Sequence, residues 1–326
     1  MNNITYQFFS FLQLCSKFLK ARTPTIITCY NLNYILKQNK TQFKPKLKFN
    51  NILGNRRYFW EFFNKYCIEW RYRKYEGRVA SSCNQELLPM LKSLLSSKMI
   101  PNWLCEIQTI TNVSSSKSLL SEFTNLNDLV LQDSQDLISE ITLENLSKNM
   151  RHYESKIFHV ETEIVSCELW SKTFTWHNTG GSHHFAAARY IANELGKEVK
   201  LTVNLELTYL DEEQFHSLFS KYEIFIISNR DVIAYQMLFE TLLNSKIPFI
   251  TAPIDTYFSH DEDYSSLRLF AFYRSEKTSH LIIEIFKHSS ALNLYDYFHT
   301  LISQQTFMIK ELENVLPPIV YNTIKY

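Results

Sequence analysis

Along residues 1–110, apolar side chains recur every three or four positions, the spacing of one face of an α-helix. The clearest case is Arg57–Lys74, where four aromatic residues lie four positions apart. The same spacing occurs in Met1–Leu19, and shorter helices are expected at Glu86–Ser97 and Asn102–Thr109. The first third of the chain is therefore predicted to be mainly helical.

The period changes to two after residue 150, which indicates β-strands. We expect strands at Lys156–Glu168, Leu169–Trp176 and Glu198–Tyr209, the last with one solvated face. A helix should begin at Ser182, and Gly196 is well placed to end it as the residue after the C-cap.

Strands and helices continue to alternate through the C-terminal third. Strands are expected at Tyr222–Ser228, Ile247–Thr251, Arg268–Arg274 and Leu281–Lys287. Helices are expected at Asp211–Lys221, Asn229–Ser245, Ala291–Ser303 and Thr306–Val315.

These patterns predict an α+β fold, with a helical basic N-terminal region followed by a mixed α/β domain that has a central sheet. Residues 111–150 are rich in Ser, Asn, Asp and Leu and favour a polar connector. The expected division is a basic helical domain at 1–110, the connector at 111–150, and a mixed α/β domain at 151–326.

The amino-acid composition indicates what kind of protein this is and in which cellular compartment it is expected. With 45% hydrophobic and 21% charged residues, the 326-residue chain is globular rather than disordered. None of its six cysteines forms a CxxC pair, so zinc is not expected, and free thiols favour a reducing, cytoplasmic location. No transmembrane segment is expected, and the N-terminus is a poor secretory signal, although its lack of acids also resembles a transit peptide.

The net charge of +1 hides a strong asymmetry. Residues 1–80 hold 15 basic and 3 acidic residues, a net charge of +12, and the remainder holds 19 basic and 30 acidic residues, a net charge of −11. The basic part is expected to bind nucleic acid, anionic lipid or an acidic protein, or to dock on the chain's own acidic part. The candidate nucleic-acid contacts beside the aromatic stripe are Arg56, Arg57, Lys65, Arg71, Arg73 and Lys74.

Two of the chain's five glycines, Gly180 and Gly181, are adjacent. A chain so poor in glycine, against an average of about 7%, is expected to need close backbone approach or positive φ at this pair. Ser182 is predicted to be a helix N-cap, followed by strong helix formers at residues 186–188. A glycine turn that opens a helix favours anion binding, because free N–H groups and the helix dipole meet there.

The run Gly-Gly-Ser-His-His-Phe-Ala-Ala-Ala-Arg at residues 180–189 resembles the nucleotide-phosphate motif of the ParB/sulfiredoxin superfamily. In that motif a glycine turn, a His or Arg pair and small residues open a helix. The resemblance covers residues 176–190 and implies an α+β fold that binds the phosphates of ATP, ADP or CTP, with or without Mg²⁺. Members include sulfinic-acid reductases, a free-serine kinase and CTP-dependent DNA clamps.

Carried onto this sequence, the resemblance implies that backbone and hydroxyl groups of residues 180–182 wrap phosphate and that both histidines contact phosphate oxygens. The candidate nucleotide-binding residues are His177, Asn178, Thr179, Gly180, Gly181, Ser182, His183, His184 and Arg189. The candidate catalytic residues are Glu163, Glu168 and His183.

Two positions depart from the superfamily's pattern. Sulfiredoxin has a cysteine where this chain has Ser182, so repair of sulfinic acid is not expected. Arginine usually occupies the place of His184, and a neutral imidazole binds phosphate more weakly than a guanidinium does. Binding should then strengthen below about pH 6.5, where histidine charges.

Two function hypotheses follow. One is a nucleotide-binding protein that acts as a phosphotransferase or nucleotide hydrolase through residues 177–189, and the other is a non-enzymatic regulator that uses its basic N-terminal region. The glycine pair could also simply join a strand to a helix. A metal site is not expected, because adjacent histidines rarely face one ion and no third ligand is identifiable, and neither a Walker A loop nor GxSxG occurs.

Overall fold

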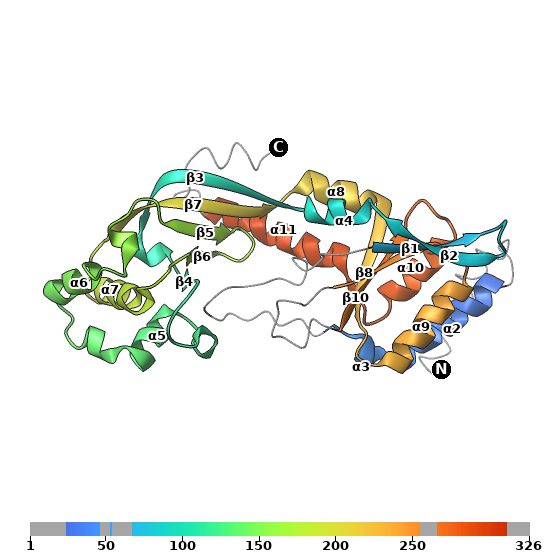
Figure 1. Ribbon diagram of the computed structural model, residues 1–326, viewed down its shortest axis with the longest axis horizontal. Helices are drawn as coiled ribbons and strands as arrows, with labels where there is room; N and C mark the ends of the chain where they lie inside the picture. The colour runs from blue at the N-terminus through green and yellow to red at the C-terminus, as the bar shows by residue number, and fades with distance from the viewer. Residues whose placement is uncertain (1–23, 46–52, 54–66, 255–265, 312–326) are drawn as a thin grey trace, which may run out of the picture. The chain divides into compact units, whose positions relative to one another are not determined.

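A computed structural model describes residues 24–45, 53, 67–254 and 266–311, which fold into two compact units (Figure 1). The first unit contains the described residues of 1–48, 58–94 and 212–299, and the second contains those of 49–57, 95–211 and 300–326. This division differs from the expected domains at 1–110, 111–150 and 151–326. Each unit is assembled from three separate stretches of chain. Changes in composition along the sequence do not show which distant stretches fold together.

The first unit is built on a six-stranded sheet in the order β11-β8-β10-β9-β1-β2, with every neighbouring pair antiparallel. Its strands are β1 (Cys67–Arg73), β2 (Arg78–Asn84), β8 (Tyr222–Ser228), β9 (Phe249–Pro253), β10 (Leu267–Tyr273) and β11 (Leu292–Asn293). β8 is buried along its whole length, as the apolar run at residues 224–227 predicts, and its one charged residue, Glu223, is paired with Arg274.

Helices complete the first unit. They are α2 (Pro24–Gln38), α3 (Lys40–Phe43), α4 (Leu87–Lys92), α8 (Glu212–Lys221), α9 (Val232–Asn244), α10 (Ser279–Lys287) and the start of α11 (Leu294–Glu311). α2, α9 and α10 share one apolar core with the sheet, whose centre is the aromatic cluster Phe225, Phe270, Phe272 and Phe286. Burial of these large rings stabilises this unit.

The second unit has a mixed five-stranded sheet in the order β3-β7-β5-β6-β4. Its strands are β3 (Leu95–Glu106), β4 (Asn112–Val113), β5 (Ile164–Glu168), β6 (Thr173–Trp176) and β7 (Lys200–Leu210). β7 pairs antiparallel with β3 and parallel with β5, and it alternates buried and half-buried residues. The register of β3 shifts between Ile100 and Trp103, where Pro101 lacks an N–H and Asn102 has a φ of 53°.

Three α-helices share an apolar core with this sheet: α5 (Leu126–Asp133), α6 (Leu143–Met150) and α7 (Ser182–Glu194), with α5 and α6 packed on α7. Residues 186–188 of α7 are fully buried, because their small side chains let the helix approach its neighbours closely. Gly196 ends α7 as predicted: it has a φ of 59°, and Lys197 N–H donates to the Ala192 carbonyl.

The helix predicted at Arg57–Lys74 is wrong for residues 67–73, which form strand β1. This stretch alternates as well as repeating every fourth residue, and pairing with β2 and β9 selects the alternation. Gly77, with a φ of 66°, allows the tight turn into β2.

Several other predicted elements are wrong. Asn102–Thr109 continues β3 into a 3-10 turn, Leu281–Lys287 belongs to α10, and one helix, α11, replaces the pair expected at Ala291–Ser303 and Thr306–Val315. The expected connector at 111–150 contains α5 and α6, which contribute to the core of the second unit. Short apolar runs carry no signal that separates a strand from a buried helix, so tertiary contacts decide these cases.

The α+β class is confirmed, and the predicted strands at Glu198–Tyr209 and Tyr222–Ser228 are confirmed as β7 and β8. The helix predicted at Met1–Leu19 lies outside the described residues. No helix in the described part of the chain is long and apolar enough to cross a lipid bilayer.

Candidate functional site

The turn between β6 and α7 fixes where α7 begins. Gly181 has a φ of 73°, in the left-handed region that favours glycine. A Cβ atom there would lie 2.5 Å from the backbone oxygen of Glu154 and 2.7 Å from the backbone nitrogen of Ser155. The glycine expected for positive φ or close approach is therefore required for both reasons.

Gly181, and not Ser182 as predicted, is the N-cap of α7, and it has no side chain with which to cap the helix. The first hydrogen bond along the helix runs from the N–H of Phe185 to the carbonyl of Gly181, at 2.9 Å. The N–H groups of residues 182–184 come before that bond, in the first helical turn, where no partner within the helix exists.

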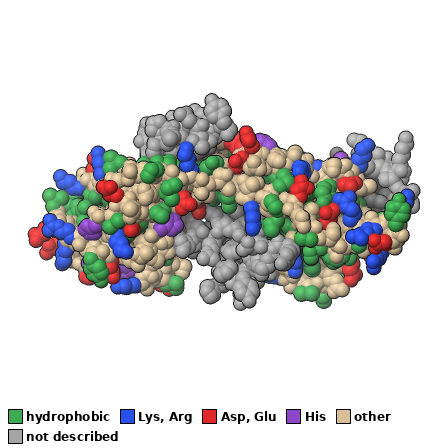
Figure 2. Space-filling model, turned by 45° about the horizontal axis from the view of Figure 1, so that its top comes forward, with side chains coloured by type: hydrophobic (Ala, Val, Ile, Leu, Met, Phe, Trp, Pro, Cys, Tyr) green, Lys and Arg blue, Asp and Glu red, His purple; other side chains and the backbone are tan. Residues whose placement is uncertain are grey.

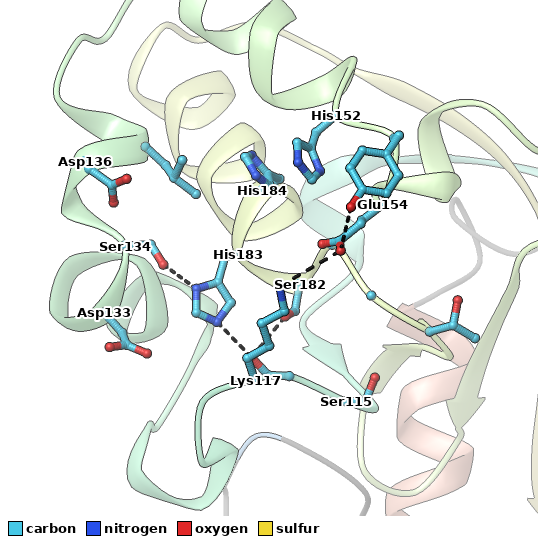
Figure 3. Close-up of a pocket in the computed structure, with 16 residues that line it drawn as sticks. Ser115, Lys117, Asp133, Ser134, Asp136, His152, Glu154, Ser182, His183 and His184 are labelled. Carbon is cyan, nitrogen blue, oxygen red and sulfur yellow. Dashed lines mark hydrogen bonds and ion pairs between the residues drawn. The ribbon is translucent and has the colours of Figure 1, made fainter.

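This helix end opens into a polar cavity of about 600 Å³ (Figure 3). Four stretches of the second unit surround it: residues 115–117, 133–137, 152–154 and 179–184. Hydroxyl, imidazole, ammonium and carboxylate groups line most of it, and Leu137 supplies the aliphatic part. The volume lies in the range of small-molecule sites.

His183 is held by serine hydroxyls at both ring nitrogens (Figure 3). Its Nε2 lies 2.9 Å from the Oγ atoms of both Ser116 and Ser118, and its Nδ1 lies 2.6 Å from Ser134 Oγ. The Oγ of Ser182 donates to Ser116 Oγ at 3.0 Å, and not to the adjacent His183. The loop that follows β4 therefore orients the imidazole at the start of α7.

His184 stacks on His152, with ring centroids 3.6 Å apart and planes 16° from parallel. Asn149 donates its amide to the carbonyl of Leu137, so its oxygen is turned to accept from His184 Nδ1, at 2.9 Å. The neutral ring then carries its proton on Nδ1 and leaves Nε2 as an acceptor. Burial, together with repulsion from His152, lowers the pKa of His184.

The charges around the cavity are mixed. The lining includes Lys117 and three acidic residues, Asp133, Asp136 and Glu154, and Lys117 Nζ is 4.0 Å from a carboxylate oxygen of Glu154. With neutral histidines, the charged residues that line the cavity therefore carry a net negative charge. Within the described residues, no group of three or more His, Cys, Asp or Glu side chains is placed to hold a metal ion.

Six of the candidate nucleotide-binding residues, Thr179 to His184, line the cavity. His177 and Asn178 do not; His177 contacts Ser166 Oγ through Nε2 at 2.7 Å. Asn178 is buried and accepts from the backbone N–H groups of Ser114 and Ser115. Its role is to join the glycine turn to the loop that carries Ser116 and Lys117.

Three further candidates also lie away from the cavity lining. Glu163 accepts from Trp176 Nε1 at 2.7 Å, and Glu168 accepts from Ser171 Oγ at 3.0 Å. The guanidinium of Arg189 donates to Asn127 Oδ1 at 2.9 Å. Of the predicted catalytic residues, only His183 lies at the cavity.

Three of the six basic residues proposed as nucleic-acid contacts lie within the part of the chain that the structure describes. Arg56, Arg57 and Lys65 lie outside the described residues. Arg71 and Arg73 belong to β1 and make ion pairs with Glu69 and Glu76, and Lys74 lies in the following turn. On the face drawn in Figure 2, basic and acidic side chains are interspersed over the described surface.

Most partners of the glycine turn were not among the predicted site residues: Ser116, Lys117, Ser134, Asn149, His152 and Glu154. They come from stretches up to about 70 residues before the turn; four of them lie inside the expected connector at 111–150, and His152 and Glu154 follow it directly. Their only local signal was the serine run at residues 114–116.

Together these features define a two-unit α+β protein with a polar, histidine-lined cavity at a helix N-terminus. A protein-family model described as "Family of unknown function (DUF6685)" matches residues 100–311. The match covers more than half of the chain and includes every residue of the cavity lining, so the chain belongs to this family. A search of the curated proteins found no match, and neither did a search of the solved structures.

Replacing Gly181 with alanine should destabilise the second unit by about 3 kcal/mol, because positive φ and a clash with fixed backbone combine. Gly196→Ala is the matched control: its φ is also positive, but a Cβ there meets nothing within 4 Å. It should lower the free energy of unfolding by only about 1 kcal/mol. Denaturant unfolding measures both, and equal losses would contradict the close approach at Gly181.

The lowered pKa of His184 makes stability depend on pH. The unfolded chain takes up this proton at about pH 6.5, before the folded chain does, so the free energy of unfolding falls as pH decreases through and below 6.5. His184→Gln should show a shallower decline when unfolding is measured between about pH 7.5 and 5. An unchanged slope in this variant would show that His184 is not the group responsible.

Proposed function

We propose that the protein binds a nucleotide through its phosphates in the cavity at the start of α7. The observation that carries this proposal is the Gly180-Gly181 turn, which opens α7 directly into the cavity and brings residues 182–184 to its wall. Backbone N–H groups of a first helical turn, aided by the helix dipole, bind phosphate oxygens well. The resemblance of residues 176–190 to the ParB/sulfiredoxin motif supports the same ligand class.

The charges of the lining favour a nucleotide that carries Mg²⁺. A free polyphosphate would be repelled by Asp133, Asp136 and Glu154, whereas Mg²⁺ is usually held by one or two carboxylates together with phosphate oxygens and waters. These carboxylates therefore fit the metal complex of ATP, ADP or CTP better than the bare nucleotide. Lys117 is the basic residue of the lining, and its ammonium would offset part of the negative charge of the bound phosphates.

His184 contributes differently from what the motif alone implies. Its Nδ1 proton is committed to Asn149, so neutral His184 presents an acceptor and cannot donate to a phosphate. Because its pKa is lowered, the strengthening of binding expected below about pH 6.5 requires more acidic solution.

The reaction class that we propose is phosphotransfer or nucleotide hydrolysis, with His183 as the catalytic side chain at the cavity and a cytoplasmic location for the protein. Binding of nucleic acid or an acidic protein through the basic N-terminal region stays a prediction. No contact among the described residues favours it, since Arg71 and Arg73 are engaged by carboxylates of their own unit.

Calorimetry with ATP, ADP, CTP and GTP, each with and without Mg²⁺, tests the proposal. We expect binding of at least one nucleotide, tighter with Mg²⁺, and weakened about tenfold by Lys117→Ala, the loss of one charge-assisted contact. Lys148→Ala, on α6 and away from the cavity lining, should bind like the wild type. Failure to bind any of the four would exclude the proposed function, and equal loss in both variants would exclude the cavity as the site.

A further inference from the structure

The serine hydroxyls around His183 form a directional chain. Ser118 Oγ donates to Asp133, because a carboxylate can only accept, and Ser182 Oγ donates to Ser116. The proton of Ser116 is thus available for His183 Nε2, which is 2.9 Å away.

The other ring nitrogen completes this arrangement. In the tautomer with the proton on Nδ1, neutral His183 would donate to Ser134 Oγ at 2.6 Å and leave Nε2 unprotonated, ready to accept from Ser116. Ser134 is 3% exposed, so the group that orients the imidazole is itself fixed by packing. A nucleophile, a base and an orienting group thus follow one another, as in serine enzymes of unrelated folds.

We infer that Ser116 is a nucleophile, that His183 is its general base, and that the group transferred to Ser116 is a phosphoryl group. The nucleophile and the base are argued from the hydrogen bonds alone. The identity of the electrophile, a phosphoric anhydride or ester, rests on the proposed function. The sequence alone could not reveal this serine–histidine pair, because Ser116 and His183 are 67 positions apart and lie in no common motif.

The transfer balances without a redox partner. Ser116 Oγ forms a bond to phosphorus while the bond from phosphorus to the leaving oxygen breaks. The Ser116 proton passes to His183 Nε2 and from there to the leaving oxygen. Water then attacks the phosphoserine, His183 takes its proton and returns it to Ser116, and phosphate leaves.

Neighbouring groups can stabilise both the positive charge that develops on His183 and the negative charge that develops on the phosphoryl oxygens. The imidazolium formed at His183 can donate from Nε2 to Ser118, whose own proton is directed at Asp133, so the carboxylate stabilises the positive charge through one hydroxyl. The N–H groups at the start of α7 and the ammonium of Lys117 lie at the same cavity, where negative charge grows on the phosphoryl oxygens.

The chain supplies a matched control in the same unit. Ser166 Oγ lies 2.7 Å from His177 Nε2, which makes a second serine–histidine pair of similar geometry. Neither residue lines the cavity, and neither lies at a helix N-terminus. Distance to an imidazole alone would make both serines reactive, whereas our inference assigns reactivity to Ser116.

The test is labelling of the full-length protein with a fluorophosphonate, a phosphorus electrophile that loses fluoride when a serine attacks. Mass spectrometry of peptides from the wild type should find the label on Ser116 and not on Ser166. His183→Gln should slow labelling at least about 100-fold, the contribution of a general base, and Ser166→Ala should label at the wild-type rate. Mapping on the wild type avoids any dependence on how Ser116→Ala folds.

Failure of this inference differs from failure of the proposed function. A protein that binds nucleotide but leaves Ser116 unlabelled overturns the nucleophile alone, and one that labels at Ser116 but binds no nucleotide overturns the ligand alone. After incubation with ATP and Mg²⁺, a phosphoryl group on the same peptide supports the phosphoryl assignment. Its absence in a protein that binds ATP and labels at Ser116 overturns that assignment.

Discussion

The close approach of Gly181 to the backbone of Glu154 and Ser155 is the constraint on which the site depends. It sets the point at which the chain leaves β6 and becomes helix, so it also decides which residues form the first turn of α7. Since Glu154 lines the cavity on one side and His183 on the other, this single backbone contact fixes two walls together. A side chain at Gly181 would separate them, whatever chemistry the cavity performs.

Buried polar bonds hold the remaining walls. Asn178 ties the glycine turn to the loop at residues 114–116, and Asn149 holds His184 while donating to the carbonyl of Leu137. Both asparagines are at least 95% buried, so their unmade hydrogen bonds would be costly and each amide has one favourable orientation. Asn149 thereby fixes the tautomer of neutral His184, and Asn178 holds the loop whose serine hydroxyls contact His183.

The sequence predicted the parts of this protein that depend on local patterns. The alternation in β7, the apolar run of β8 and the glycine that ends α7 each follow from side-chain period or backbone freedom. The hairpin β1-β2 and the long strand β3 could not be predicted, because partners far along the chain select the strand over the helix. The cavity divides in the same way: the glycine turn carried a compositional signal, whereas Ser116, Asn149 and His152 become its neighbours only through packing of α5, α6 and α7.

We propose that phosphate binds at the first turn of α7. Following the backbone amide resonances of Ser182, His183 and His184 by NMR during a titration with Mg²⁺-ADP tests this claim most directly. If phosphate binds there, these three resonances should show saturable shifts, larger than those of amides elsewhere in the second unit. Unchanged resonances at these residues, while amides of β1 and β2 respond to the nucleotide, would contradict it.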